Sequence, residues 1–412
     1  MALGLRAGYG GVQLYRSTDR TALTFPDEQQ YWTMARGLRQ GGPLADELGF
    51  CATRMPLYPG FLSIFAGGDG GVVSARMCQW VIGALAAVFA CLLGNRVGGP
   101  DVGLAAGLLV AADPSLVGVS SLLLTETPFV AVVAALWWVG WPLASRARHS
   151  QAVACAPASD GVRSLQQSEP GMGRWLGVGA LSALCVYVRP SSAGLVLAWT
   201  VFLLVRQRST LRAWGGAAIV VGTVVICLLP WALRNQRITG HLCWLTHRAG
   251  ISLYDGVGPQ ATGASNLGAI KSMPAVAGLD EAAWNRWFVT ESLRSIRSDP
   301  VRIIRLAGVK LARTWSPVLH AEEYRSTGIR LVFAAWSLAF FALAIAGMVM
   351  LRKEAGICLA LLLPALYISA LHSVFVGSVR YRTGAVPMLA VLSAVALVGL
   401  LKLLRKRCAE HC

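Results

Sequence analysis

Long apolar stretches separated by short polar connections make up most of this chain. A transmembrane helix needs about 20 predominantly apolar residues, and short or re-entrant segments need somewhat fewer. Three of the stretches, over 101–115, 175–189 and 190–205, are short for a full span. The pattern predicts an all-α, polytopic bundle of transmembrane helices, with candidate spans over 72–94, 101–115, 123–143, 175–189, 190–205, 214–233, 329–351, 356–376 and 384–403.

The N-terminal segment follows a different, more polar pattern. Apolar positions at helical spacing predict an amphipathic helix over 27–40, and the two glycines after it are a stop signal. The prolines in the stretch 54–62 prevent a regular helix from starting before Leu57, so we expect an interfacial segment there. Nothing before residue 55 resembles a signal peptide or a spanning helix. We therefore expect a first transmembrane helix to lie upstream, the alternative being a polar N-terminus that is translocated unaided.

The polar segments divide the chain into regions. A stretch rich in Ala, Ser, Gln and Arg over 144–173 predicts a flexible loop between two blocks of helices. Two further helical patterns, over 280–298 and 300–315, combine large apolar residues with arginines, as interfacial helices do. We expect an N-terminal segment at 1–70, transmembrane helices at 71–233, a long loop region at 234–328, further transmembrane helices at 329–403 and a tail at 404–412.

Composition indicates that the chain lies in a membrane, and the distribution of charge indicates which segments face each side. A hydrophobic fraction of 55%, a charged fraction of 14% and a mean hydropathy of +0.56 exclude an ordinary soluble domain. The net charge of +17 would suit nucleic acid, but the cations fall at every second connection, as the positive-inside rule requires. We expect no nucleic-acid partner. The segments 1–70 and 234–328 then face the extracytoplasmic side of a cell membrane, and the basic connections and the C-terminal tail face the cytoplasm.

The sequence carries no nucleotide or zinc motif. The Gly-rich stretch 67–71 matches neither type of phosphate loop, and the ten cysteines lack metal-type spacing. Cys51 and Cys243 both fall on the outer side and can either pair or stay free, which spacing alone does not decide. The six histidines form no i, i+4 pair within a span.

Two adjacent carboxylates, Asp27 and Glu28, precede the apolar helices in a chain with only 20 acidic residues. A carboxylate at the lipid boundary can act as a general base for an acceptor hydroxyl or amine, or hold a divalent cation. The alternative is helix capping, because Pro26 and Asp27 fit an N-terminus whose capping box Gln30 completes. The local pattern leaves both interpretations open.

Further charged residues fall at the outward ends of the predicted spans. Glu126 is a boundary acid, a class that is usually functional, although it could also favour the start of a helix, whereas Asp113 before a proline fits a cap or turn. Several arginines can converge on one outward cavity, where guanidinium groups bind phosphate in a bidentate way; anchoring to lipid headgroups is the alternative. These arginines are Arg54, Arg234, Arg380 and Arg382.

The order of these motifs resembles that of the GT-C membrane glycosyltransferases. The branch it resembles comprises the protein O-mannosyltransferases and the aminoarabinose and Rgt-type lipopolysaccharide sugar transferases. The order of the motifs is more specific than any one of them. The resemblance is carried by Asp27-Glu28 with Tyr31, Arg54 with Pro56-Leu57-Tyr58-Pro59, Thr125-Glu126-Thr127-Pro128-Phe129, Arg189-Pro190 and Pro230-Trp231-Ala232-Leu233-Arg234-Asn235.

The resemblance implies a GT-C-like fold and a sugar donor carried on a polyprenyl phosphate. It gives Asp27 the role of a base or a metal-associated carboxylate, with Glu28 beside it. It makes Glu126 the acid of the second outward connection. Substrate binding is implied for Arg54, which would face the donor phosphate, and for Tyr58, Arg234, Arg380 and Arg382.

We therefore expect a membrane glycosyltransferase that moves a hexosyl or pentosyl group from a polyprenyl-phosphate donor to a lipid, polysaccharide or protein acceptor on the outer face. The pattern requires no cofactor, and a divalent metal ion beside the carboxylates stays open. A transporter or flippase would bind the same headgroup, and a non-catalytic assembly protein is a third class. A transporter should show inverted repeats and polar residues at mid-membrane, and the sequence shows neither.

Overall fold

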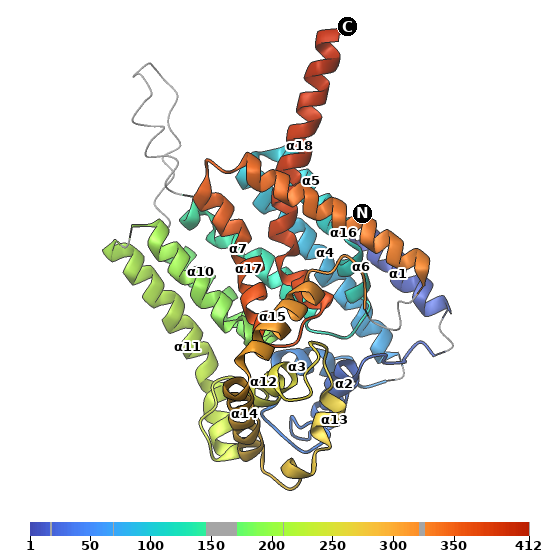
Figure 1. Cartoon of the computed structure of the whole chain (residues 1–412), viewed down its shortest axis with the longest axis vertical. Helices are drawn as coiled ribbons and strands as arrows, with labels where there is room; N and C mark the ends of the chain where they lie inside the picture. The colour runs from blue at the N-terminus through green and yellow to red at the C-terminus, as the bar shows by residue number, and fades with distance from the viewer. Residues whose placement is uncertain (17–18, 69, 146–170, 209, 321–325, 412) are drawn as a thin grey trace.

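The chain folds into a helical bundle whose loop regions gather at one end (Figure 1). The structure, a computed structural model, describes residues 1–16, 19–68, 70–145, 171–208, 210–320 and 326–411. Most of the flexible loop expected over 144–173 lies outside the described residues. Within the described part all regular secondary structure is helical, which confirms the predicted fold class.

The described residues contain six helices that are long and apolar enough to cross a membrane. The three stretches that the sequence marked as short are also helices, with 10 to 17 residues each. Gly99, at a φ of 88°, ends one helix and lets Pro100 begin the next. The long helices are α4 (Gly71–Gly98), α7 (Glu126–Ala144), α11 (Leu211–Thr239), α16 (Thr327–Met350), α17 (Ala355–Val374) and α18 (Val386–His411) with the preceding 3₁₀ turn η5 (Val379–Ala385); the shorter ones are α5 (Pro100–Ala112), α9 (Met172–Val188) and α10 (Ala193–Arg206).

Helix α7 lies inside the bundle and α16 lies at its edge. The apolar window of α7 is 72% buried, against 28% for α16. Trp137 of α7 stacks on Trp199 of α10 with ring centroids 4.4 Å apart, and its indole N–H donates to the carbonyl of Ala360 in α17 at 2.8 Å. An apolar core thus joins the two blocks of helices, and side chains that point outward from α16 remain free to contact lipid.

The short helices of the N-terminal and 234–328 regions pack together at the end of the bundle opposite the C-terminus (Figure 1). The predicted helix over 27–40 is observed as α2, and the segment after Pro56 becomes helical at Leu57, as the prolines required. The predicted patterns over 280–298 and 300–315 are observed within one residue of their limits. This end comprises α2 (Pro26–Arg39), α3 (Leu57–Ser63), α12 (Ala249–Val257), α13 (Leu267–Lys271) and α14 (Glu281–Ser298), with α15 (Pro300–Thr314) returning to the bundle.

The basic connections lie at the other end. The Arg206 side chain at the end of α10 donates to the carbonyl of Ala144 at the end of α7, at 3.1 Å. Lys402 of α18 lies 3.7 Å from Asp101 at the start of α5. The two ends therefore separate the basic connections from the acidic motif, as the predicted alternation requires.

Helix α1 (Ala2–Arg16) was not predicted. It packs on α4, α5 and α6 (Pro114–Val119). Gly10 lies so close to Trp80 that a Cβ atom there would come within 2.2 Å of the indole ring. The buried Arg6 donates to the carbonyls of Val110 and Ala111 at 3.5 and 3.4 Å, and so satisfies the last turn of α5. Four glycines in the segment hid this helix, because glycine disfavours helix interiors.

Lys310 fastens α15 to the end of α17. Its side chain is fully buried, and its Nζ donates to the carbonyls of Val374 and Ser373 at 2.6 and 3.2 Å. Burial, assisted by Arg302, lowers the pKa of Lys310 from 10.5 to about 8. A neutral amine keeps both hydrogen bonds without the cost of a buried charge.

This arrangement predicts that Lys310 contributes more stability at high pH. Because the unfolded chain binds the lysine proton more tightly than the folded chain, stability should rise between pH 8 and 10.5, by at most about 3 kcal/mol. Thermal unfolding in detergent at pH 7 and pH 10 measures this for the wild type and Lys310→Met. The stability of the wild type relative to Lys310→Met should be greater at pH 10 than at pH 7. An equal difference at both pH values would contradict the assignment.

Candidate functional site

One face of α2 binds the arginine that precedes α3. Asp27, Gln30 and Tyr31 are spaced i, i+3 and i+4, so their side chains share one side of the helix. Arg54 donates to the Asp27 Oδ1 atom at 2.6 Å, to the Gln30 Oε1 atom at 2.8 Å and to the Tyr31 hydroxyl at 3.0 Å. This local pattern turns a loop arginine into a fixed part of the site.

Two more arginines reach the same carboxylate from distant parts of the chain. Arg380, in the turn η5, donates to the Asp27 Oδ2 atom at 2.7 Å, and Arg248, just before α12, lies 3.8 Å from Oδ1. Arg248 also donates to Gln30 at 3.3 Å. Burial alone would raise the pKa of Asp27, but Arg54, Arg380 and Arg248 outweigh it and hold that pKa well below its usual value. Asp27 is therefore a stable anion in this state.

The neighbouring carboxylate, Glu28, points in another direction, because consecutive residues are about 100° apart around a helix. It is fully buried. One oxygen accepts from the backbone N–H groups of Thr24 and Phe25, each at 3.1 Å, and the other accepts from the N–H of Leu123 at 2.8 Å. The capping role considered for Asp27 and Gln30 thus belongs to Glu28, since the N-cap position is Phe25.

Glu126 forms an ion pair with Arg380. It is the first residue of α7 and is 2% exposed. Its Oε1 atom lies 3.5 Å from the Nε atom of Arg380 and 3.4 Å from the Nη2 atom of Arg189. Asp113 instead caps α6, accepting from the N–H of Leu116 at 3.0 Å, which confirms the role expected for it. The two boundary acids therefore differ in function.

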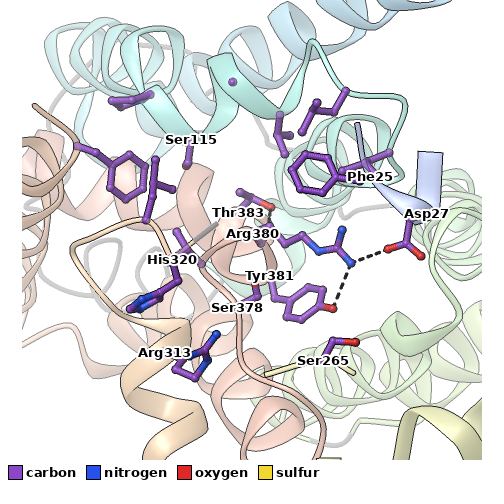
Figure 2. A pocket seen from close by; sticks show the side chains of 18 of the residues that line it. Phe25, Asp27, Ser115, Ser265, Arg313, His320, Ser378, Arg380, Tyr381 and Thr383 are labelled. Atoms are coloured by element: carbon purple, nitrogen blue, oxygen red, sulfur yellow. Dashed lines mark hydrogen bonds and ion pairs between the residues drawn. The ribbon is translucent and has the colours of Figure 1, made fainter. Parts of the chain in front are cut away.

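A cavity of about 1270 Å³ opens beside Asp27 (Figure 2). Asp27, Arg248 and Arg380 line it, whereas Arg54 and Glu126 contact these residues without lining the cavity. Figure 2 shows Arg380 between Asp27 and the phenol of Tyr381, whose hydroxyl accepts from Arg380 at 3.3 Å. Other walls are apolar and come mainly from α1, α6 and α16. The cavity thus combines a charged wall with an apolar one.

Besides Arg54, three more of the predicted substrate-binding residues do not line this cavity. Tyr58 is buried and donates to Gln79 of α4 at 2.7 Å. Arg234 donates to the carbonyl of Cys51 at 2.5 Å, and the buried Arg382 donates to a backbone carbonyl just after α15 at 2.6 Å. Their contacts hold loops and helices in place. Cys51 and Cys243 are both free thiols in this structure.

Sequence reasoning missed several residues of the site. Arg248 lies within a long polar region with many arginines, where no local spacing distinguishes it. Gln30 was considered only as a cap. Tyr381 stacks on His372 with ring centroids 4.2 Å apart, and Arg189 lies 5.2 Å from the same tyrosine ring. Tyr381 could have been predicted as a site residue because it follows Arg380 directly in the sequence.

The residues around Asp27 do not suit a divalent cation. Both Asp27 oxygens are paired with guanidinium groups. Glu126 is paired with the guanidinium groups of Arg189 and Arg380. Four arginines surround these two carboxylates, so a metal ion would meet an excess of positive charge. Across the described ranges, no three His, Cys, Asp or Glu side chains come together as a metal site.

Comparisons with known proteins identify the fold. No protein-family model and no curated sequence matches the chain. The structure of the oligosaccharyltransferase from Archaeoglobus fulgidus, tethered with an acceptor peptide containing the NVT sequon, is similar with a TM-score of 0.52 at 13% sequence identity. The similarity covers 98% of this chain and 50% of the archaeal enzyme, so the chain spans about half the length of that relative.

A second solved structure with similarity is ArnT from Cupriavidus metallidurans bound to undecaprenyl phosphate. Its TM-score is 0.40 at 14% identity, over 94% of this chain and 77% of ArnT. This chain therefore shares its fold with the Archaeoglobus oligosaccharyltransferase, in agreement with the GT-C-like fold that the motif order implied. The narrower branch within that group stays a prediction.

The geometry predicts different consequences for the two adjacent carboxylates. Glu28→Ala leaves three backbone N–H groups, the buried one of Leu123 and the partly buried ones of Thr24 and Phe25, without their acceptor and should lower the free energy of unfolding by about 2 kcal/mol or more. Asp101→Asn, at an exposed acid in the first turn of α5, is the control and should have little effect. Thermal unfolding in detergent is the measurement. Equal stability of Glu28→Ala and the control would contradict a structural role for Glu28.

Proposed function

We propose that this protein transfers a sugar from a polyprenyl-phosphate donor to an acceptor on the outer face of the membrane. The observation that carries the proposal is the carboxylate of Asp27 in a cavity wall between Arg248 and Arg380. A fold of the GT-C type and an adjoining apolar wall support it. The basic connections at the opposite end of the bundle favour an extracytoplasmic site.

The arginines suit a phosphate leaving group. Four of them, Arg54, Arg189, Arg248 and Arg380, surround the carboxylates of Asp27 and Glu126 and leave two positive charges in excess. Cleavage of the sugar–phosphate bond converts a phosphodiester into a phosphomonoester, whose charge is about −1.5 to −2 at neutral pH. Guanidinium groups already in place stabilise that growing charge.

Arg248 and Arg380 are the better candidates for direct phosphate contact. Both line the cavity, whereas Arg54 does not and is held by three hydrogen bonds to α2. Arg248 lacks a close carboxylate oxygen, since its nearest one is 3.8 Å away. Burial, together with Arg54, lowers the pKa of Arg248 to about 10, so it remains a cation at neutral pH. Arg54 then acts as a positioning residue.

Asp27 would act in two stages. Paired with arginines it is a weak base, because its pKa is held well below the usual value. When a donor phosphate takes hydrogen bonds from Arg248 and Arg380, its negative charge offsets the positive charge of these arginines. The arginines then stabilise the Asp27 anion less, and the pKa of Asp27 rises. The carboxylate can then accept the proton of the acceptor hydroxyl or amine. The acceptor atom bonds to the anomeric carbon as the bond from that carbon to the phosphate oxygen breaks.

The apolar wall suits the hydrocarbon chain of the donor. Gly4 and Gly8 of α1, Gly118 of α6 and Gly328 of α16 all line the cavity, and a Cβ atom at any of them would meet no atom within 4 Å. These glycines keep the passage wide. A polyprenyl tail could therefore lie beside these helices while its phosphate reaches the arginines.

The first test is transfer itself. Membranes containing the protein are incubated with labelled polyprenyl-phosphate sugars, and both the released carrier and the labelled product are followed. Asp27→Asn should lower transfer by about 100-fold or more, because the base and the anchor of the arginines are lost together. Arg380→Gln should lower it by about tenfold or more. Arg237→Gln, at an exposed arginine of α11, is the control.

The same assay separates the competing classes. A transporter or flippase would move the labelled lipid without cleaving the sugar–phosphate bond, and an assembly protein would do neither. Because Asp27→Asn leaves the partly buried Arg54 and Arg248 without their carboxylate, Asp27→Glu is included as a variant that keeps the charge and should fold. Unchanged transfer by a folded Asp27→Asn protein would exclude the proposed role of Asp27.

A second test concerns the apolar wall. Gly8→Leu would fill part of the passage and should cost about 1 to 3 kcal/mol in binding a long-chain donor, or at least about fivefold in KM. A donor with a short prenyl chain should be less affected. Gly11→Leu is the matched control on the same helix, since Gly11 does not line the cavity. Equal effects of the two substitutions would place the tail elsewhere.

A further inference from the structure

A second group of polar side chains lies across the cavity from Asp27. Figure 2 shows Arg313 and His320 on the far side from Asp27, with Ser378 between them and Tyr381. Arg313 is in the last turn of α15, His320 follows that helix, and Ser378 precedes η5. All three line the cavity.

Arg313 retains hydrogen-bonding capacity in this position. Within the described part of the chain, its guanidinium makes a single long hydrogen bond, from Nε to the carbonyl of Gly377 at 3.4 Å. The terminal nitrogens, which form the bidentate fork of an arginine, have no carboxylate partner among the described residues. Gly263 also packs on the Arg313 side chain, because a Cβ at Gly263 would lie 3.6 Å from Cδ. The aliphatic part of the Arg313 side chain is therefore packed, and its terminal guanidinium nitrogens can bind a ligand.

The carboxylates of the described cavity lining are already engaged. Asp27 binds Arg54 and Arg380, and Glu47 pairs with Lys271 and accepts from Gln30 at 3.1 Å. The surroundings of Arg313 are instead cationic. Burial, together with Arg313 and Arg330, lowers the pKa of His320 below its usual value. This wall therefore lacks an anion of its own in the described structure.

The donor phosphate does not account for this second cation. Its proposed position is beside Arg248 and Arg380, on the Asp27 wall. The acceptor must reach the anomeric carbon from within the same cavity, so it has to occupy space between the two walls. Any negatively charged group on the acceptor would find Arg313 on the far wall.

We propose that Arg313, with His320 and Ser378, binds an anionic group of the acceptor, so that the acceptor is a phosphate- or carboxylate-bearing molecule and not a neutral one. This inference rests on the proposed transferase function for the identity of the ligand as acceptor. The anion site itself can be tested without transfer.

The binding test uses the full-length protein in detergent and four probes. Glucose 6-phosphate and glucuronate carry the two anionic groups, glucose is the neutral counterpart, and farnesyl phosphate represents the donor end. Calorimetric titration should show tighter binding of at least one anionic sugar than of glucose. Arg313→Gln should weaken that binding by about tenfold or more. Arg313→Lys should retain part of it.

Matched variants separate the two walls. Arg305→Gln changes an exposed arginine on the same helix and should leave all four affinities unchanged. Arg248→Gln should weaken the binding of farnesyl phosphate and leave that of the anionic sugar unchanged. Arg313→Gln should weaken the binding of the anionic sugar and leave that of farnesyl phosphate unchanged. Thermal unfolding confirms that each variant is folded.

The outcomes distinguish this inference from the proposed function. Equal binding of glucose and both anionic sugars to the wild type overturns the anion site. Loss of farnesyl phosphate binding in Arg313→Gln, with anionic-sugar binding unchanged, also overturns it and assigns Arg313 to the donor. Arg313-dependent binding without any transfer supports the site and contradicts the transferase. In an active enzyme, Arg313→Gln should raise the acceptor KM about tenfold and leave the donor KM unchanged.

Discussion

The ion pairs of Asp27 are the interaction on which the site depends. They bring α2, the loop before α3, the residue before α12 and the turn η5 to one point, across as many as 353 positions of sequence. Three guanidinium groups so close together would repel one another without a carboxylate among them. Asp27 thus does more than supply one charged oxygen. It makes the convergence of Arg54, Arg248 and Arg380 energetically tolerable, and the convergence in turn gives a cavity wall that can accept a phosphate.

Two adjacent acids have separate tasks because of helix geometry. Asp27 faces the cavity, and Glu28, about 100° further around the helix, faces the bundle. Glu28 joins α2 to the segment before α7 through the N–H of Leu123. Glu126, at the start of α7, lies 3.5 Å from the Nε atom of Arg380. Two buried acids therefore help to position the site: Glu28 holds the helix that carries Asp27, and Glu126 pairs with Arg380.

The cavity has charge on one side and hydrocarbon on the other, and the bundle produces this contrast. Helices α1, α6 and α16 leave a glycine-lined passage where they surround the cavity. The loops of the 234–328 region supply polar groups such as Ser265 and Arg248. A lipid with a charged head and an apolar tail matches both surfaces at once. This chain shares its fold with the Archaeoglobus enzyme over half of that enzyme's length.

The amino-acid sequence by itself determined the helices and the order of the polar regions. Hydrophobic length and proline or glycine signals are local properties, so α2, α14 and α15 and the three short apolar helices could be predicted from them. It also pointed to Asp27 and Arg380. Only the tertiary structure decided that Glu28 is a buried cap, that Tyr58 and Arg234 hold loops, and that Arg248 belongs to the site. These roles depend on which distant backbone a side chain meets, and neither periodicity nor charge along the chain records that.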